Sequence, residues 1–191
     1  IRNLFRNRIY ALINILGLSV GLAVSLLILF YIKYELSFDK FHQQKDNIYR
    51  LIHINEQPNE TTKHCITMPV MGPDIAEKFP EVKHFVRFRS PQAGFFSYEE
   101  NNYFASNITY SDSALFDVFS FDLMVGNPKT ALSEPYSIVL TKSLAHKIFG
   151  NEKAIGKVIS YNKSDQYTVT GIMDDFPHTS HLNFSAIFSF S

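Results

Sequence analysis

Few residues in this 191-residue sequence have the types and spacing that catalysis requires. Ser143 and His146 lie three residues apart, where one helix could present a nucleophile beside its base. No carboxylate stands near them in the sequence to orient the histidine, so a complete catalytic set cannot be assembled from sequence alone. The sequence therefore predicts a protein that is not an enzyme.

Metal and cofactor sites are not predicted either. His178 and His181 follow Asp174 and Asp175 at a spacing that could hold a metal ion. However, Pro177, which directly precedes His178, favours a solvent-exposed loop. Cys65 beside His64 has no second thiol to complete a zinc site, and as the single cysteine it cannot form an internal disulfide.

The Gly156-Lys157 pair invites comparison with a phosphate-binding loop, which places four residues between its glycines and Ser or Thr after its lysine. Here five residues separate Gly150 from Gly156, and Val158 follows Lys157. The pattern fails, and no cofactor is expected. The 18 basic residues balance the 18 acidic ones, so no excess positive charge favours nucleic acid.

The elements that organise the chain begin with the run Ile9–Ile32, whose 24 residues include no charged residue, histidine or proline. A helix of this length spans about 36 Å, enough to cross a bilayer. The run is longer than the apolar region of a signal peptide, about 7–15 residues, so we predict an uncleaved transmembrane helix. Residues 1–8 form an amphipathic preface, which either lies among the lipid headgroups or starts the same helix.

Charges at the helix ends suggest its orientation. Arg2, Arg6 and Arg8 precede it, whereas a long domain that translocates with little regard for charge follows it. We therefore expect a cytoplasmic N-terminus and a domain outside the bilayer.

Small residues within the span predict helix packing. Gly17, Gly21 and Ser25 stand four apart on one face, and Asn14 lies one turn earlier toward the same side. Small side chains allow a second helix to approach closely in lipid. This face favours a helix that packs against others over a solitary tether.

Residues 33–47 are predicted to continue as a helical stalk, with Lys33, Glu35, Phe38 and Phe41 coupling the membrane helix to the following domain. Residues 48–191 mix helical and strand patterns without strict alternation, which predicts an α+β domain. The strands are expected at 48–54, 61–68, 82–89, 95–98, 103–110, 136–140, 158–161 and 167–172, and the helices at 69–79, 112–119 and 141–149.

The N-terminal stretch from Arg2 to Leu51 resembles the start of FtsX-like ABC transporter permeases, particularly forms common in Bacteroidetes. Later segments are similar to the extracytoplasmic core domain of the macrolide-exporter (MacB-type) branch. These are FDVFSFDLMVG (116–126), SIVLTKSLAHKIFG (137–150) with Ile155-Gly156-Lys157, YTVTGIMDDFP (167–177) and HLNF (181–184). The likeness runs in order along nearly the whole chain.

The resemblance implies a permease subunit of a bacterial inner-membrane exporter, with a periplasmic domain and four membrane helices, of which this sequence holds the first. It further implies a partner ABC ATPase, a second permease copy and an outer adaptor. ATP binding inside would move the outer domain, a mechanism called mechanotransmission. The alternative class is a membrane-anchored sensor whose outer domain feeds a signalling module.

Overall fold

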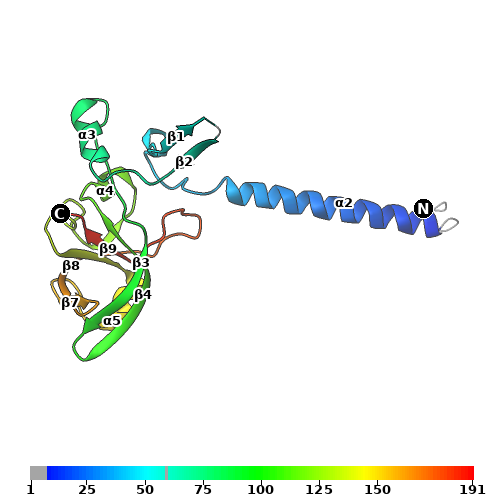
Figure 1. Cartoon of the computed structure of the whole chain (residues 1–191). Helices are drawn as coiled ribbons and strands as arrows, with labels where there is room; N and C mark the ends of the chain where they lie inside the picture. The colour runs from blue at the N-terminus through cyan, green and yellow to red at the C-terminus, as the bar shows by residue number, and fades with distance from the viewer. Residues whose placement is uncertain (1–7, 59) are drawn as a thin grey trace. The chain divides into compact units, whose positions relative to one another are not determined.

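The computed structural model describes residues 8–58 and 60–191, and it divides into two compact units between Lys40 and Phe41 (Figure 1). The described part of the first unit is dominated by α2 (Arg8–Glu35), a 28-residue helix whose side chains are all exposed or partly exposed. By length and composition α2 can cross a membrane. This result confirms the expected N-terminal apolar helix.

The chain leaves α2 earlier than predicted, so a helical stalk over 33–47 is wrong beyond Glu35. The amide of Ser37 bonds the carbonyl of Tyr34 at 3.0 Å, and its hydroxyl donates to the same carbonyl at 2.6 Å. These bonds satisfy the backbone in a tight turn instead of a continued helix. Asp39 then adopts a positive φ of 54°, and only the short 3-10 helix η1 (Lys45–Asn47) follows.

Seven strands form the main sheet of the second unit, in the order β5-β8-β6-β9-β4-β3-β7. Their bounds are β3 (Gln92–Tyr98), β4 (Asn101–Ser111), β5 (Leu123–Gly126), β6 (Ser137–Thr141), β7 (Val158–Tyr161), β8 (Asp165–Met173) and β9 (Ala186–Ser189). Because β7 pairs with both β3 and β8, the sheet curls until six of its strands close on themselves. A separate two-stranded sheet joins β1 (His53–Gln57) to β2 (Glu60–His64).

Strand β6 has both of its faces covered, and all five of its residues are buried. Side chains alternate along a strand, so Ile138 and Leu140 enter one hydrophobic cluster while Val139 enters the other. The neighbouring β9 repeats this arrangement, with Phe188 in the first cluster and Ile187 in the second. Such two-sided burial explains why both strands read as continuous apolar runs.

Helix α5 (Lys142–Phe149) covers the first face, as predicted from its end signals, and lies beside β4 in Figure 1. The Thr141 side chain accepts a hydrogen bond from the Leu144 amide and so caps the helix. At the other end, the Gly150 amide bonds the His146 carbonyl at 2.8 Å with φ of 60°. The buried residues of α5 are Leu144, Ala145, Ile148 and Phe149.

The other elements follow the sequence unevenly. The two hairpins, β3–β4 and β7–β8, are confirmed. Helices α3 (Met71–Lys78) and α4 (Leu115–Val118) are shorter than expected. The strands expected at 48–54 and 82–89 are wrong: β1 begins only at His53, and the second run keeps one isolated bridge, from Phe88 to Ser111.

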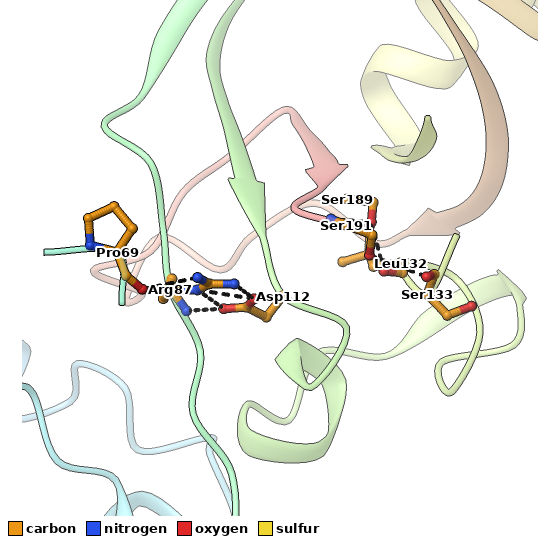
Figure 2. Close-up of polar contacts among 7 residues, drawn as sticks. All are labelled: Pro69, Arg87, Asp112, Leu132, Ser133, Ser189 and Ser191. Carbon is orange, nitrogen blue, oxygen red and sulfur yellow. Dashed lines mark hydrogen bonds and ion pairs between the residues drawn. The ribbon is translucent and has the colours of Figure 1, made fainter. Parts of the chain in front are cut away.

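An ion pair between Arg87 and Asp112 holds this second run against the end of β4 (Figure 2). The guanidinium of Arg87 makes three hydrogen bonds to the carboxylate, at 2.5–3.2 Å, and donates to the Pro69 carbonyl at 3.0 Å. The hydrogen bond to Asp112 raises the pKa of Arg87 and so favours the charged guanidinium. At the same end of the sheet, Ser189 donates to the Leu132 carbonyl and Ser191 to that of Ser133.

We predict that Gly94→Ala destabilises the second unit. A Cβ at this position would lie 2.5–2.7 Å from ring atoms of Tyr161, a buried residue of β7. Overpacking of this kind costs roughly 1–3 kcal/mol in the free energy of unfolding, measurable by denaturation followed by circular dichroism. In a Tyr161→Leu background the same change should cost less. An equal cost in both backgrounds would show that Tyr161 is not the obstacle.

Candidate functional site

The structure brings a carboxylate to Ser143 that the sequence could not place there. Asp175, from the segment after β8, accepts a 2.6 Å hydrogen bond from the Ser143 hydroxyl and a 3.3 Å bond from its amide. Both donors lie in the first turn of α5, so Asp175 satisfies the helix N-terminus and favours it electrostatically. The carboxylate contacts the serine directly and orients no histidine between them, which is not a Ser-His-Asp arrangement.

Beside this contact lies an open groove of about 390 Å³, between the start of α5, β4 and residues 175–185. Most of its polar side chains are used within the protein. Lys147 donates to the Phe104 carbonyl at 2.7 Å, and Ser143 bonds Asp175. The groove therefore offers a ligand few uncommitted polar groups.

The remaining chemistry-bearing residues do not converge. Within residues 8–58 and 60–191, no three His, Cys, Asp or Glu side chains are placed to hold a metal ion. Cys65 is exposed. Lys157, the residue of the failed phosphate-loop pattern, pairs with Glu152 and donates to the Tyr98 hydroxyl at 2.8 Å. The hydrogen bond to Glu152 raises the pKa of Lys157. The Lys157 side chain therefore joins the loop between α5 and β7 to Tyr98 of β3.

The most distinctive polar arrangement joins the start of the second unit to residues 119–121. The Ser120 amide donates to Nδ1 of His42 at 3.1 Å, and the Gln43 amide donates to the Ser120 hydroxyl at 2.9 Å. These two bonds tie segments 77 or 78 positions apart in the sequence. We call Phe41–Gln43 together with Phe119–Phe121 the joint.

Aromatic rings surround the histidine of the joint. His42 is only 4% exposed, and its ring centroid lies 4.1 Å from that of Phe41, 5.2 Å from Phe119 and 5.0 Å from Phe121. Phe121 in turn packs edge-on against Phe176 at 4.8 Å. The joint therefore belongs to the hydrophobic cluster on the second face of the sheet.

The hydrogen bond fixes how the His42 ring is used. A nitrogen that accepts an amide proton carries none itself, so the neutral ring bears its proton on Nε2. An aromatic or aliphatic replacement could fill the space but could not accept the Ser120 amide. This combination of apolar packing and one directional acceptor gives the joint a defined orientation.

The predicted coupling residues divide at the boundary between the units. Lys33 and Glu35 lie in the last turn of α2, and Phe38 stacks edge-on with Tyr34 at 5.3 Å in the turn that follows. Phe41 alone enters the domain cluster. Phe41 does not lie on the predicted helical stalk, and no sequence motif had marked His42 as a structural residue. The available signal was the Phe-His pair itself, together with Phe-Ser-Phe at 119–121.

The packing and topology roles of the membrane-helix residues remain predictions. No atom of another element lies within 4 Å of a Cβ added at Gly17 or Gly21. The Ser25 hydroxyl donates to the Gly21 carbonyl at 2.8 Å, so it is satisfied within the helix. Asn14 is exposed on α2, and Arg8 is the first residue of that helix. Arg2 and Arg6 lie outside the described residues, as does most of the predicted amphipathic preface at residues 1–8.

These features define a class: an α+β domain that directly follows a helix able to span a membrane, with the start of the domain held in its own core by an aromatic joint. The profile of the MacB-like periplasmic core domain matches residues 11–191. The chain therefore belongs to the MacB-like periplasmic core domain family, and the resemblance seen in its sequence is confirmed.

One solved structure agrees at the level of fold, and two others are less similar. A domain described as part of a permease protein from Porphyromonas gingivalis is 22% identical, with a TM-score of 0.58, and the match covers 68% of this chain and 55% of that one. The periplasmic region of MacB from Actinobacillus actinomycetemcomitans is 20% identical (TM-score 0.46; 61% and 55% covered). The extracellular domain of the noncanonic ABC-type transporter YknZ from Gram-positive bacteria is 19% identical (0.43; 55% and 54%).

The chain thus spans about half the length of the solved domains it matches. No curated protein matches its sequence.

The joint yields a prediction for His42→Leu. This change leaves the partly buried Ser120 amide without its acceptor, which costs about 1–3 kcal/mol in the free energy of unfolding. Hydrogen exchange at the Ser120 amide should be faster in His42→Leu than in the unaltered protein. The matched control is His53→Leu on the exposed strand β1, where we expect a change within about 0.5 kcal/mol. Equal effects of the two changes would contradict the role given to His42.

Proposed function

We propose that this protein is the permease subunit of an ABC-type exporter, in which ATP binding and hydrolysis on a partner ATPase move the extracytoplasmic domain. The chain contributes α2 as its first membrane helix and the second unit as the moving part. The observation that carries this proposal is the joint, because it places Phe41 and His42, the first residues of the second unit, in the domain's own hydrophobic core.

The connection between the two parts is short. Five residues, 36–40, separate the end of α2 from Phe41. Even fully extended, they reach roughly 17–18 Å. A shift or rotation of α2 therefore pulls on the joint after little slack has been taken up, and the joint transfers it to the packed sheet. A continuous helical stalk is not needed for this coupling.

We place the protein in the bacterial inner membrane with its N-terminus in the cytoplasm and its domain in the periplasm. Arg2, Arg6 and Arg8 support this orientation, because basic residues are retained on the cytoplasmic side. The family of the domain, which is named for its periplasmic location, supports the same orientation. An outer adaptor would then meet the domain in the periplasm.

The first experiment is a pull-down of the complete protein from solubilised membranes. Recovery of an ABC ATPase whose hydrolysis rate depends on the permease supports the proposal. Recovery of a histidine kinase or chemotaxis module instead would show that the anchored-sensor alternative is right. If no ATPase is recovered and no ATPase domain is fused to the chain, the exporter proposal fails.

Coupling through the joint predicts the phenotype of His42→Leu in cells. The variant should still recover the ATPase, because the ATPase meets the cytoplasmic side, but export-dependent growth or secretion should fall severalfold. His53→Leu, which alters an exposed histidine of β1, should behave as the unaltered protein does. Unimpaired export by a correctly folded His42→Leu protein would contradict coupling through the joint.

Assembly with a second permease copy is expected to use the face formed by Gly17, Gly21 and Ser25. Gly21→Leu would hold a neighbouring helix away, because close approach at this face requires small side chains. Crosslinking between copies should therefore drop severalfold while membrane insertion persists. Ala23→Leu, which also enlarges a small side chain but on the opposite side of the helix, is the control. Unchanged crosslinking in Gly21→Leu would exclude this face.

A further inference from the structure

The stretch between the joint and the main sheet folds without a core of its own. From Gln43 to Ser90, no residue that the structure describes is buried, although the stretch includes β1, β2 and α3. Large apolar side chains remain exposed here, at Tyr49, Leu51, Ile52, Ile54, Ile66, Met68, Val70 and Phe79. An exposed apolar surface of this kind marks a contact with another polypeptide or a membrane.

The run Val82–Arg89 shows which contact is missing. It has the alternating pattern of a strand and lies along the end of β4, where the Arg89 amide bonds the Tyr110 carbonyl at 3.2 Å. The Arg87 amide bonds the Asp112 carboxylate at 2.7 Å on the same side. Successive amides of an extended chain point to opposite edges. Because the amides of Arg87 and Arg89 both face β4, that of Phe88 points away from it, and an extended chain turns those of Val86 and His84 the same way.

This second edge is open. Within the described residues, the amides of His84, Val86 and Phe88 have no backbone hydrogen-bond partner. The run is nevertheless held in place. Val86 and Phe88 pack on the second hydrophobic cluster, and the Arg87 guanidinium joins Asp112 to Pro69 (Figure 2). A fixed, extended segment with one free edge is a template for an added strand.

The distribution of charge favours a protein partner over lipid. The tip of the β1–β2 hairpin is polar, with Asn55, Glu56, Glu60 and Lys63, which is unsuited to insertion in a bilayer. The exposed apolar residues flank its open end, and residues 64–73 include no Lys, Arg, Asp or Glu. Depletion of charge around exposed Ile, Met and Val is typical of the buried centre of a protein interface.

We propose that the free edge of Val82–Arg89 pairs with a strand supplied by a further part of the same MacB-like polypeptide, outside these 191 residues. That strand and its flanking residues would cover α3 and the exposed apolar side chains around the hairpin base. The match to the P. gingivalis domain supports this source of the strand. It covers 55% of that domain, which leaves nearly half of it without a counterpart in this chain.

Hydrogen exchange of the complete gene product tests the pairing at single residues. The amides at His84, Val86 and Phe88 should exchange at least about tenfold more slowly than in the 191-residue chain, independently of protein concentration. Protection that rises with concentration, or that is already present in the 191-residue chain, would overturn the proposal in favour of a second copy. Protection that appears only in lipid, or none at all, would overturn it as well.

A pair of variants separates pairing from folding. His84→Pro removes one donor of the free edge, whereas His84→Ala keeps it. In the complete protein, His84→Pro should accelerate exchange at Val86 and Phe88 about tenfold relative to His84→Ala. Exchange in β6, which β9 separates from β4, should remain slow in both variants and so report intact folding. Equal exchange at Val86 and Phe88 in the two folded variants would overturn the proposal.

Discussion

The need to cover both faces of β6 and β9 governs the second unit. Each of these central strands places apolar side chains on both sides, so the sheet requires two separate hydrophobic clusters. On one face α5 supplies the cover, together with the aromatic side chains that the curled sheet brings inside. No helix of comparable length covers the other face within the described residues. Loops and short turns cover it instead, and their aromatic side chains replace a helix.

This second cover explains why the joint lies where it does. The cluster gathers Phe41, Phe119, Phe121 and Phe176 from three separate segments, which have little regular backbone hydrogen bonding of their own. Side-chain bonds such as those at Ser120 take over that function. Because Phe41 and His42 are core residues, the sheet and the entry of the chain into the domain are stabilised by the same contacts. Loosening one weakens the other.

The elements that sequence predicted well have local signals at both ends. Thr141 and Gly150 mark the two ends of α5. The two hairpins are predicted by strand-like segments on either side of a polar turn. Strand β9 has no such signal. Its apolar run, Ala186–Ser189, is too short to tell a strand from a loop, and it becomes a strand because β4 and β6 offer edges on either side. Long-range pairing of this kind cannot be inferred from a local window.

The errors have the same origin. Residues 36–47 have helical spacing and no proline, yet the Ser37 hydroxyl and the burial of Phe41 in a distant cluster end the helix. His42 carried no catalytic or metal signature, and its role depends on an amide that is 78 residues away. The run at 82–89 differs from these cases, because it is held beside β4 and, on our proposal, lacks only a partner strand. A correct pattern without a partner indicates an edge awaiting a strand, whereas at residues 36–47 the pattern itself was overridden by tertiary contacts.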